Sequence, residues 1–401
     1  MEKHLKEIKK AQERISPVIK KTPLIFSELY SEKSGNKVYI KPENLQKTGS
    51  FKIRGAYNKI ASLTPEQRGK GLITASAGNH AQGVAYSARS LGAEATIVMP
   101  IQTPFIKVES TKSYGSEVVL HGSSFDDAYE KALEITLNND GTFIHPFDDI
   151  EVIYGQGTIA LEIIEELPNV DAILVPIGGG GLISGIALAA KAINPGIRII
   201  GVEAEGAPTL THSLKNREVT ALEYVNTIAD GTAVKKAGRK TFEIIREYVD
   251  DIILISEEDL MNSFLTMLEK HKLVCEHSGV LSLAATEKLN FYNKNIVSLI
   301  SGGNTDVVTI SSMINNGLVS SGRLFGFSVE LPDRPGELVR IAEILSKSNS
   351  NVIKLEHNQF KAFNRINNVV LEVTIETYGF DHIKAIKDEL ASQGYTIKQI
   401  Y

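Results

Sequence analysis

Short apolar runs alternate with stretches of helical periodicity over most of the chain. The runs are typical of buried strands, and the stretches between them repeat their apolar positions every three to four residues. Strands are predicted at 37–42, 71–74, 95–99, 117–120, 142–144, 172–177, 198–203, 251–255 and 295–300. Helices are predicted at 1–14, 52–60, 81–91, 103–114, 124–138, 155–167, 182–193, 241–249, 257–271 and 278–289. This order indicates βαβ units, so we predict an α/β protein with two parallel-sheet lobes and a cleft between them.

The pattern changes after about residue 312. Residues 315–322 are mostly small and polar, which predicts a linker over residues 313–323. Apolar and polar residues then alternate over 325–331 as in a half-buried strand. The elements that follow have the order βαββαβ, which is the order of a ferredoxin-like unit. We therefore predict a first domain of residues 1–312, with a small lobe at about 48–147 within it, and a second domain of residues 324–401.

Composition excludes several classes of protein. A chain of 401 residues is too long for one simple core, which agrees with several domains. The net charge of −5 argues against a general nucleic-acid or membrane-surface binder. Cys275 is the only cysteine, so the chain can form neither an internal disulfide nor a cysteine zinc cage. The N-terminus lacks the apolar core of a signal peptide, and no apolar run is long enough to span a membrane, so we expect a cytoplasmic protein.

Lys52 follows a polar turn at Gly49 and Ser50 and lies between Phe51 and Ile53. Ser50 is predicted to cap a helix, which places Lys52 in its first turn. A lysine near the positive end of a helix dipole and shielded by apolar neighbours should have a lowered pKa. A neutral lysine can form a Schiff base with a carbonyl compound. The simpler alternative for this segment alone is a surface lysine on an amphipathic helix.

Four consecutive glycines, residues 178–181, lie between the predicted strand 172–177 and the predicted helix 182–193. Backbone N–H groups of such a loop can converge on an anion, and the start of the helix adds its positive end. The segment has neither the spacing of a dinucleotide fingerprint nor that of a P-loop. We predict a phosphate-binding loop, with a flexible turn as the alternative.

Two further loops follow predicted strands. Residues 76–83 have the sequence SAGNHAQG and open a helix, so their free N–H groups could bind a carboxylate. Simple helix capping by Ser76 or Asn79 is the alternative, and His80 is expected to be structural rather than a base. Ser301, in the sequence SGGN, would point its hydroxyl into the cleft unless it is only a turn residue.

Two carboxylates have less distinctive surroundings. Glu203 ends a predicted strand and, with a loop carbonyl near Ala207, could hold a cation, although a solvated carboxylate is the simpler interpretation. Glu276 and His277 precede a helix, for which capping is the simpler explanation.

Together, the lysine after a Ser-Phe turn, the SxGNHxxG loop, the glycine loop and the late SGGN resemble the fold-type II pyridoxal-phosphate enzymes. Within these, residues 15–311 are most similar to the threonine dehydratases, also called threonine ammonia-lyases. The last 80 or so residues resemble an ACT regulatory domain, with Asp333-Arg334-Pro335-Gly336 at its first turn.

The resemblance implies roles for individual residues. Lys52 would form the Schiff base with pyridoxal 5′-phosphate and move the proton at Cα. Phe51 and Asn79 would contact the cofactor ring, and Ser301 its pyridine nitrogen. The phosphate would be bound by Gly178, Gly179, Gly180 and Gly181. The substrate carboxylate would be bound by Ser76, Ala77, Asn79 and His80. The implied reaction converts L-threonine to 2-oxobutanoate and ammonia, and also L-serine to pyruvate.

One departure from the related serine racemases is informative. They resemble this chain in the substrate loop but carry a second serine at the position of Ala77, which serves as proton carrier on the opposite face. Ala77 has no proton to give, so elimination should dominate over racemisation. Glu203 and Ala207 match two ligands of a racemase cation site, but Thr209 replaces the acidic third ligand. A divalent ion is therefore not expected, and a monovalent cation is the remaining candidate.

Alternatives remain at this point. The chain could be a serine dehydratase or racemase of the same fold, or a non-catalytic amino-acid sensor that works through its C-terminal domain. The ACT resemblance implies a small-molecule effector, and feedback by isoleucine or valine would fit a role in isoleucine biosynthesis. By resemblance, a homo-oligomer is expected, either a dimer or a tetramer.

Overall fold

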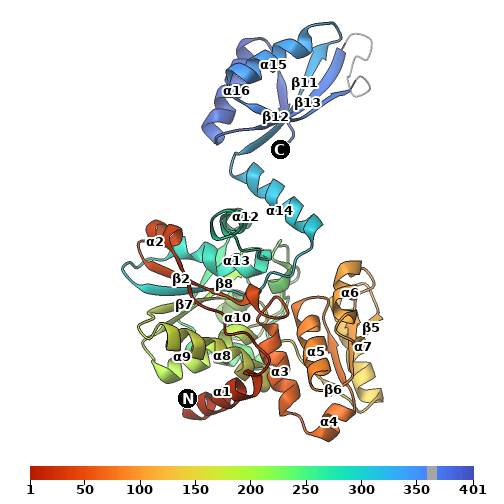
Figure 1. The fold of residues 1–401 in the computed structure, drawn as a ribbon, viewed down its shortest axis with the longest axis vertical. Helices are drawn as coiled ribbons and strands as arrows, with labels where there is room; N and C mark the ends of the chain where they lie inside the picture. Colours follow the sequence, from red (N-terminus) through yellow and green to blue (C-terminus); the bar gives the residue numbers. More distant parts are fainter. Residues whose placement is uncertain (359–367) are drawn as a thin grey trace. The chain divides into compact units, whose positions relative to one another are not determined.

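The structure is a computed structural model that describes residues 1–358 and 368–401. It divides into two units, Met1–Asp306 and Val307–Tyr401 (Figure 1). The first unit contains two sheets of mainly parallel strands and the second contains an antiparallel sheet, which confirms the predicted fold class. None of the helices in the described ranges is long and apolar enough to cross a bilayer.

The larger lobe of the first unit is built on a six-stranded sheet with the order β1-β2-β10-β7-β8-β9. Only the β1–β2 pair is antiparallel. The strands are Ile25–Ser27 (β1), Lys37–Pro42 (β2), Ala172–Pro176 (β7), Arg198–Ala204 (β8), Asp251–Ile255 (β9) and Asn295–Ile300 (β10). Most of β7 and β8 is buried, as expected for parallel strands that helices cover on both faces.

Helices cover the two faces of this sheet (Figure 1). On one face lie Glu2–Ile15 (α1), Ile150–Glu166 (α8) and Gly181–Ile193 (α9), and on the other lie Glu257–Thr266 (α12) and His277–Ala284 (α13). The remaining helices of this lobe are Glu28–Ser34 (α2), Thr209–Asn216 (α10) and Arg239–Tyr248 (α11). Short helical turns occur at Glu43–Leu45 (η1), Asp230–Thr232 (η2), Met267–His271 (η3) and Ala285–Lys288 (η4).

The smaller lobe has a parallel four-stranded sheet with the order β5-β4-β3-β6. Its strands are Leu72–Ala75 (β3), Ala95–Met99 (β4), Glu117–Leu120 (β5) and Thr142–Phe143 (β6). Its helices are Lys52–Ser62 (α3), Pro65–Gly69 (α4), Asn79–Ser90 (α5), Phe105–Lys112 (α6) and Phe125–Asn138 (α7). All these elements fall within residues 48–147, the range expected for the small lobe.

The second unit has the antiparallel order β12-β13-β11-β14 and two helices that cover the sheet. Its elements are Val307–Ser320 (α14), Leu324–Pro332 (β11), Glu337–Lys347 (α15), Asn351–Asn358 (β12), Asn368–Glu376 (β13), Phe380–Ser392 (α16) and Ile397–Gln399 (β14). The predicted βαββαβ order is therefore present between β11 and β14. Residues 313–320 belong to α14 instead of the predicted linker, because Met313 and Gly317 are four apart and share one buried helix face.

Three local predictions need correction. Ser50 does not cap α3: the cap position is Phe51, and the Ser50 backbone pairs with Gly302 in an isolated bridge. The predicted helix at 257–271 splits into α12 and a π-helical turn. Pro335 lies before α15 rather than in its first turn, because Gly336 takes the cap position with a left-handed φ of 99°.

Helix α3 crosses α8 at very short range. A Cβ atom on Gly55 would lie 2.7 Å from the carbonyl oxygen of Val152, and one on Gly155 would lie 2.5 Å from the carbonyl oxygen of Arg54. Any side chain at either glycine would therefore push the two backbones apart. The crossing fastens the helix that begins at Lys52 to the larger lobe.

A buried cluster of four charges lies at the same crossing. Arg54 binds both oxygens of Glu43 at 2.7 and 2.8 Å, and both oxygens of Glu162 at 2.6 and 2.9 Å. Lys41 donates to Glu162 at 2.6 Å, and Thr22 donates to Glu43 at 2.7 Å. The two positive and two negative side chains are almost completely buried, so each depends on its partners for the hydrogen bonds that water would otherwise supply.

Replacing Arg54 by alanine should destabilise the protein by about 3–5 kcal/mol, because two buried carboxylates would lose their shared partner. The free energy of unfolding in urea measures this. Lys21→Ala is the control: its ion pair with Glu165 is exposed and screened by water, so its loss should change stability little. Equal losses in the two variants would contradict the assigned importance of the cluster.

Candidate active site

A cavity of about 930 Å³ lies where the carboxyl ends of strands from both lobes meet. It is bounded by the start of α3 and by the loops after β3, β7 and β10. The residues that the sequence nominated for cofactor and substrate all line it: Phe51, Lys52, Ser76, Ala77, Asn79, His80, Gly178, Gly179, Gly180, Gly181 and Ser301. Glu203 and Ala207 are not among its lining residues.

Lys52 presents its amine to this cavity from the first turn of α3. Its Nζ donates to the carbonyl oxygen of Pro146 at 3.1 Å and lies 5.3 Å from the centroid of the Phe51 ring. Burial lowers the pKa of Lys52 to about 8, and the negative charge of Glu276 partly opposes that shift. A substantial fraction of the amine is therefore neutral near pH 8, as a nucleophile or proton acceptor requires.

The glycine loop lines the cavity and has no room for side chains. A Cβ atom on Gly179 would lie 2.4 Å from the ring of Phe147, and one on Gly181 would lie 2.9 Å from the Phe147 backbone. Gly180 has a φ of 91°, which disfavours any residue with a side chain. Because α9 begins at Gly181, its first N–H groups are free of helical partners. This cradle fits a phosphate group.

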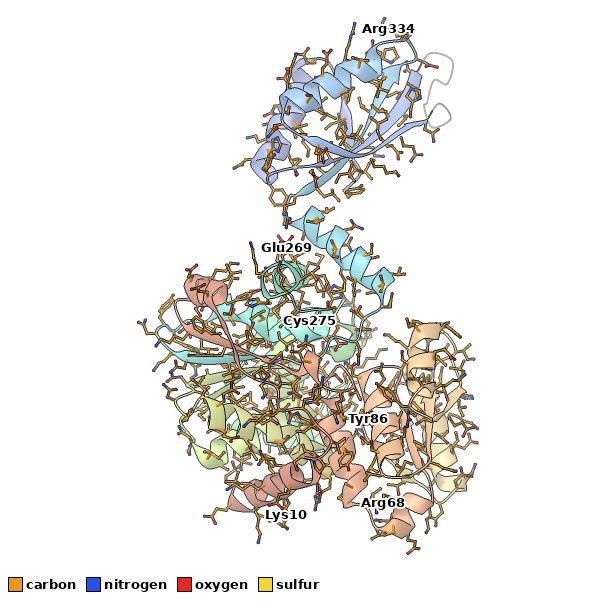
Figure 2. All side chains as sticks on the ribbon, in the orientation of Figure 1. Lys10, Arg68, Tyr86, Glu269, Cys275 and Arg334 are labelled. Atoms are coloured by element: carbon orange, nitrogen blue, oxygen red, sulfur yellow. The ribbon has the colours of Figure 1, made fainter. Side chains whose placement is uncertain are left out.

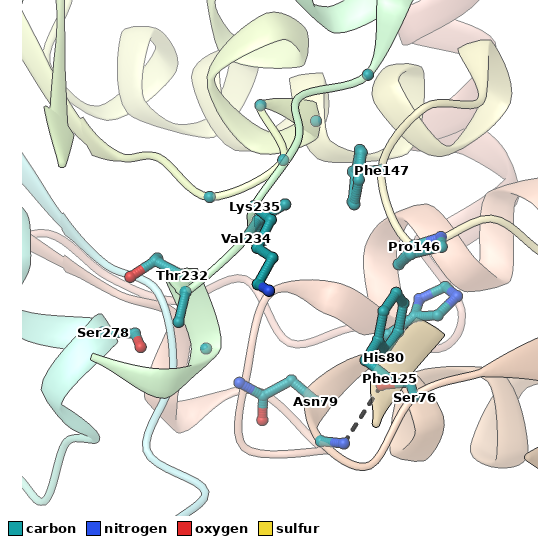
Figure 3. A pocket seen from close by; sticks show the side chains of 18 of the residues that line it. Ser76, Asn79, His80, Phe125, Pro146, Phe147, Thr232, Val234, Lys235 and Ser278 are labelled. Carbon is teal, nitrogen blue, oxygen red and sulfur yellow. Dashed lines mark hydrogen bonds between the residues drawn. The ribbon is translucent and has the colours of Figure 1, made fainter. Parts of the chain in front are cut away.

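The loop after β3 presents a second helix start. Asn79 is the first residue of α5, and its cap residue Gly78 makes no side-chain capping bond. Ser76 accepts a hydrogen bond from the Gly78 N–H at 3.3 Å and so shapes the loop without capping the helix. Figure 3 shows Ser76, Asn79 and His80 together on this side of the cavity. The free N–H groups of α5 therefore suit a carboxylate.

Two buried histidines in the cavity wall are neutral at pH 7. Burial lowers the pKa of His80 to about 3, and its Nε2 contacts the carbonyl oxygen of Ile144 at 3.0 Å. Burial also lowers the pKa of His145 to about 4. Its Nδ1 accepts hydrogen bonds from the N–H groups of Phe147 and Asp148 at 3.2 and 2.8 Å. Both rings hold backbone in place, as predicted for His80.

Two serines lie at the large-lobe wall. The Ser301 hydroxyl is buried and contacts the carbonyl oxygen of Ser278 at 3.4 Å. The Ser278 hydroxyl is buried and has no partner, although it lines the cavity (Figure 3). Buried hydroxyls normally find a partner, so an unpaired one in a cavity indicates a polar group that binds there. The two serines fit the polar edge of a heteroaromatic ring.

Glu276 is a site residue that sequence reasoning missed. It occupies the cap position of α13, but its side chain makes no capping bond. Instead it accepts a hydrogen bond from Asn79 Nδ2 at 2.7 Å. Burial raises its pKa to about 7, and Asp230 adds to the rise. The only sequence signal was a carboxylate directly before the uncharged, buried segment that forms α13.

Glu203 is buried, so its interpretation as a solvated carboxylate is wrong. It accepts hydrogen bonds from the N–H groups of Leu210 and Thr211 at 2.7 and 2.9 Å, and from the Thr211 hydroxyl at 2.7 Å. It thereby satisfies the start of α10. Within residues 1–358 and 368–401, no group of three His, Cys, Asp or Glu side chains could hold a metal ion. A monovalent cation at Glu203 and Ala207 stays a prediction.

Cys275 and Arg334 can be placed as well (Figure 2). Cys275 is buried inside the first unit, and burial raises the pKa of its thiol, so it is unreactive. Arg334, in the turn predicted to be regulatory, donates to Glu337 at 2.9 Å and remains largely exposed.

In protein free of cofactor, Lys52 should react with trace acetic anhydride with a midpoint near pH 8, whereas an ordinary lysine titrates at about 10.4. Mass spectrometry of the peptide that contains Lys52 measures the extent of labelling. Glu276→Gln should move this midpoint to lower pH, because it removes the negative charge that favours the protonated amine. A midpoint above pH 10 in the wild-type protein would contradict the described environment of Lys52.

Comparisons with known proteins agree with this geometry. Residues 15–302 match the family model described as "Pyridoxal-phosphate dependent enzyme". An L-threonine ammonia-lyase of Thermotoga maritima is 45% identical over 395 residues, which are 98% of each chain. The processed threonine deaminase isoform 2 of Solanum lycopersicum is a solved structure with 39% identity and a TM-score of 0.75, covering 78% of this chain and 87% of its own.

A maize serine racemase structure is similar too, with 38% identity and a TM-score of 0.74. The match covers 79% of this chain and 98% of the racemase. The family match spans most of the first unit and includes the lysine and the loops of the cavity. The chain therefore belongs to the pyridoxal-phosphate dependent enzymes.

Proposed function

We propose that this protein is a lyase that converts L-threonine to 2-oxobutanoate and ammonia, and L-serine to pyruvate and ammonia. The observation that carries the proposal is the convergence on one cavity of the Lys52 amine, two helix starts suited to anions and a buried serine pair. The near full-length similarity to a protein named L-threonine ammonia-lyase supports the choice of substrate.

The residues of the cavity fit pyridoxal 5′-phosphate. Residues 178–181 would hold its phosphate, Ser301 would meet its pyridine nitrogen, Phe51 and Asn79 would contact its ring, and Lys52 would hold it covalently. When bound, the cofactor supplies the electron sink that acidifies the Cα–H bond of an amino acid. Ser301 is a neutral partner, which does not enforce protonation of the ring nitrogen and so favours prompt loss of a β-substituent.

Lys52 can then act as the base. Its amine has a pKa of about 8, so it can accept the Cα proton while the β-hydroxyl leaves with a proton as water. The start of α5 would bind and orient the substrate carboxylate. Release of the enamine, followed by addition of water and loss of ammonia, gives the 2-oxo acid.

Ala77 separates elimination from racemisation. It lines the cavity at the position where the related racemases carry a serine, and its methyl group cannot deliver a proton. Racemisation needs a proton on the face opposite Lys52, so this reaction should be slow. The similarity to the maize serine racemase keeps serine racemisation as the second candidate function.

The second unit is proposed to be an ACT regulatory domain that binds a small effector, with Asp333-Arg334-Pro335-Gly336 at its binding turn. Its βαββαβ order and the left-handed Gly336 before α15 support this assignment. Inhibition by isoleucine or valine would fit isoleucine biosynthesis, and activation would fit threonine breakdown. A homo-oligomer remains an expectation from resemblance.

Purified protein with pyridoxal 5′-phosphate should form 2-oxobutanoate from L-threonine faster than it forms D-serine from L-serine. A coupled dehydrogenase assay measures the oxo acid, and chiral chromatography measures D-serine. Lys52→Ala should lose turnover by at least about a thousandfold, together with the visible absorbance of the covalently held cofactor. Faster formation of D-serine would favour the racemase, and binding without any turnover would favour the amino-acid sensor.

Deleting residues 321–401 should leave basal threonine turnover close to that of the full chain and should abolish the response to branched-chain amino acids. The first unit has its own cores and sheets, and the maize racemase corresponds to 79% of this chain, so the remaining part should fold alone. Turnover with and without isoleucine or valine measures this. An unchanged effector response in the shortened protein would refute the regulatory assignment.

A further inference from the structure

A chain of hydrogen bonds joins four segments at the edge of the cavity. Asn304 Nδ2 donates to the carbonyl oxygen of Thr48 at 2.6 Å and to Asn79 Oδ1 at 2.8 Å. Asn79 Nδ2 then donates to Glu276 Oε1 at 2.7 Å. Asn79 starts α5 of the small lobe, whereas Asn304 and Glu276 lie in large-lobe segments next to β10 and α13.

The two ends of this series of hydrogen bonds, Thr48 and Glu276, define the orientation of the Asn79 amide. The Thr48 carbonyl can only accept, so the atom of Asn304 facing it must be its amide nitrogen. The atom of Asn79 that faces Asn304 must then be its oxygen. An ionised Glu276 also only accepts, which requires the nitrogen of Asn79 on its side. Both ends therefore select the same orientation, and one N–H of Asn79 Nδ2 remains beyond the bond to Glu276.

Two glycines make room for this arrangement. A Cβ atom on Gly302 would lie 2.5 Å from Glu276 Oε1 and 3.1 Å from Asn79 Nδ2. A Cβ atom on Gly49 would lie 2.1 Å from Asn304 Oδ1, and Gly49 also has a φ of 70°. These contacts explain why one glycine precedes Ser50 and another follows Ser301: a side chain at either position would displace a member of the hydrogen-bond chain.

We propose that Asn304 and Glu276 are positioning residues that hold the Asn79 amide with its nitrogen, rather than its oxygen, directed at the bound cofactor. The free N–H then faces the cavity that Asn79 lines and can donate to an anionic ring oxygen of the cofactor. In the opposite orientation an amide oxygen would face that anion and repel it. This inference rests on pyridoxal 5′-phosphate as the cofactor of the proposed reaction.

The test compares cofactor binding by full-length variants. Asn79→Ala should weaken binding of pyridoxal 5′-phosphate about tenfold, since one hydrogen bond to a charged group is lost. Asn304→Ala and Asn304→Asp should weaken this binding by a similar factor, although the side chain at position 304 does not contact the cofactor in the proposed arrangement. All three should shift the visible absorbance maximum of the bound cofactor in the same direction. Fluorescence titration of cofactor-free protein measures the dissociation constant.

Asn44→Ala is the matched control. Asn44 Nδ2 donates to the carbonyl oxygen of Val274 at 2.9 Å, so the variant loses a comparable bond in the same region without touching Asn79. Cofactor affinity and absorbance should be unchanged in it. Thermal unfolding without cofactor shows whether each variant folds, and Asn304→Asp provides an isosteric variant if Asn304→Ala does not.

A double variant shows whether Asn304 acts through Asn79. Adding Asn304→Ala to Asn79→Ala should weaken cofactor binding no further than Asn79→Ala alone. Two outcomes would overturn the inference: Asn304 variants with the affinity and absorbance of Asn44→Ala, or independent losses that multiply in the double variant. Failure of the proposed function itself would be visible separately, as wild-type protein that binds no cofactor or forms no oxo acid.

Discussion

The site depends above all on the position of helix α3. That position is fixed by helix–helix contacts so close that only glycine fits at them. A Cβ atom on Gly83 of α5 would lie 3.2 Å from the backbone of Lys52, so α5 packs against α3 at Lys52 itself. On its other side α3 meets α8 through Gly55 and Gly155. Helix α3 is thus packed directly against a helix of each lobe, and its position depends on both lobes.

The series of close crossings continues to the glycine loop, residues 178–181. A Cβ atom on Gly185 of α9 would lie 2.2 Å from the Ile153 carbonyl oxygen and 2.6 Å from the Gly157 nitrogen of α8. Helices α5, α3, α8 and α9 are therefore packed in order at backbone contact. Three of them begin at the cavity, at Asn79, Lys52 and Gly181. Interiors packed this tightly do not deform gradually, so the three helix starts keep their spacing.

Much of the fold was predictable because its strands carry local signals. The strands at 37–42, 95–99, 117–120, 251–255 and 295–300 have the predicted bounds, since each is a short run with clear flanking turns. The bond between Asn79 and Glu276 joins residues that are 197 positions apart. Nothing in the sequence of either segment indicates that the other is its partner. The burial of Glu203 was missed for a different reason: its partners lie only seven and eight positions away, but they start α10, a helix that the sequence pattern did not reveal.

The electrostatics of the cavity distinguish Lys52 from another buried lysine, Lys41. The side chains of Lys41 and Lys52 are both shielded from water. Lys41 donates to the carboxylate of Glu162 and is one of the four charges of the buried cluster. Lys52 instead donates to an uncharged carbonyl group, that of Pro146. Its burial disfavours the protonated amine and lowers its pKa to about 8. The nearby histidines, His80 and His145, are neutral and use ring nitrogens to hold backbone. Lys52 and Glu276, with pKa values of about 8 and about 7, are therefore two groups of this wall whose protonation changes near neutral pH.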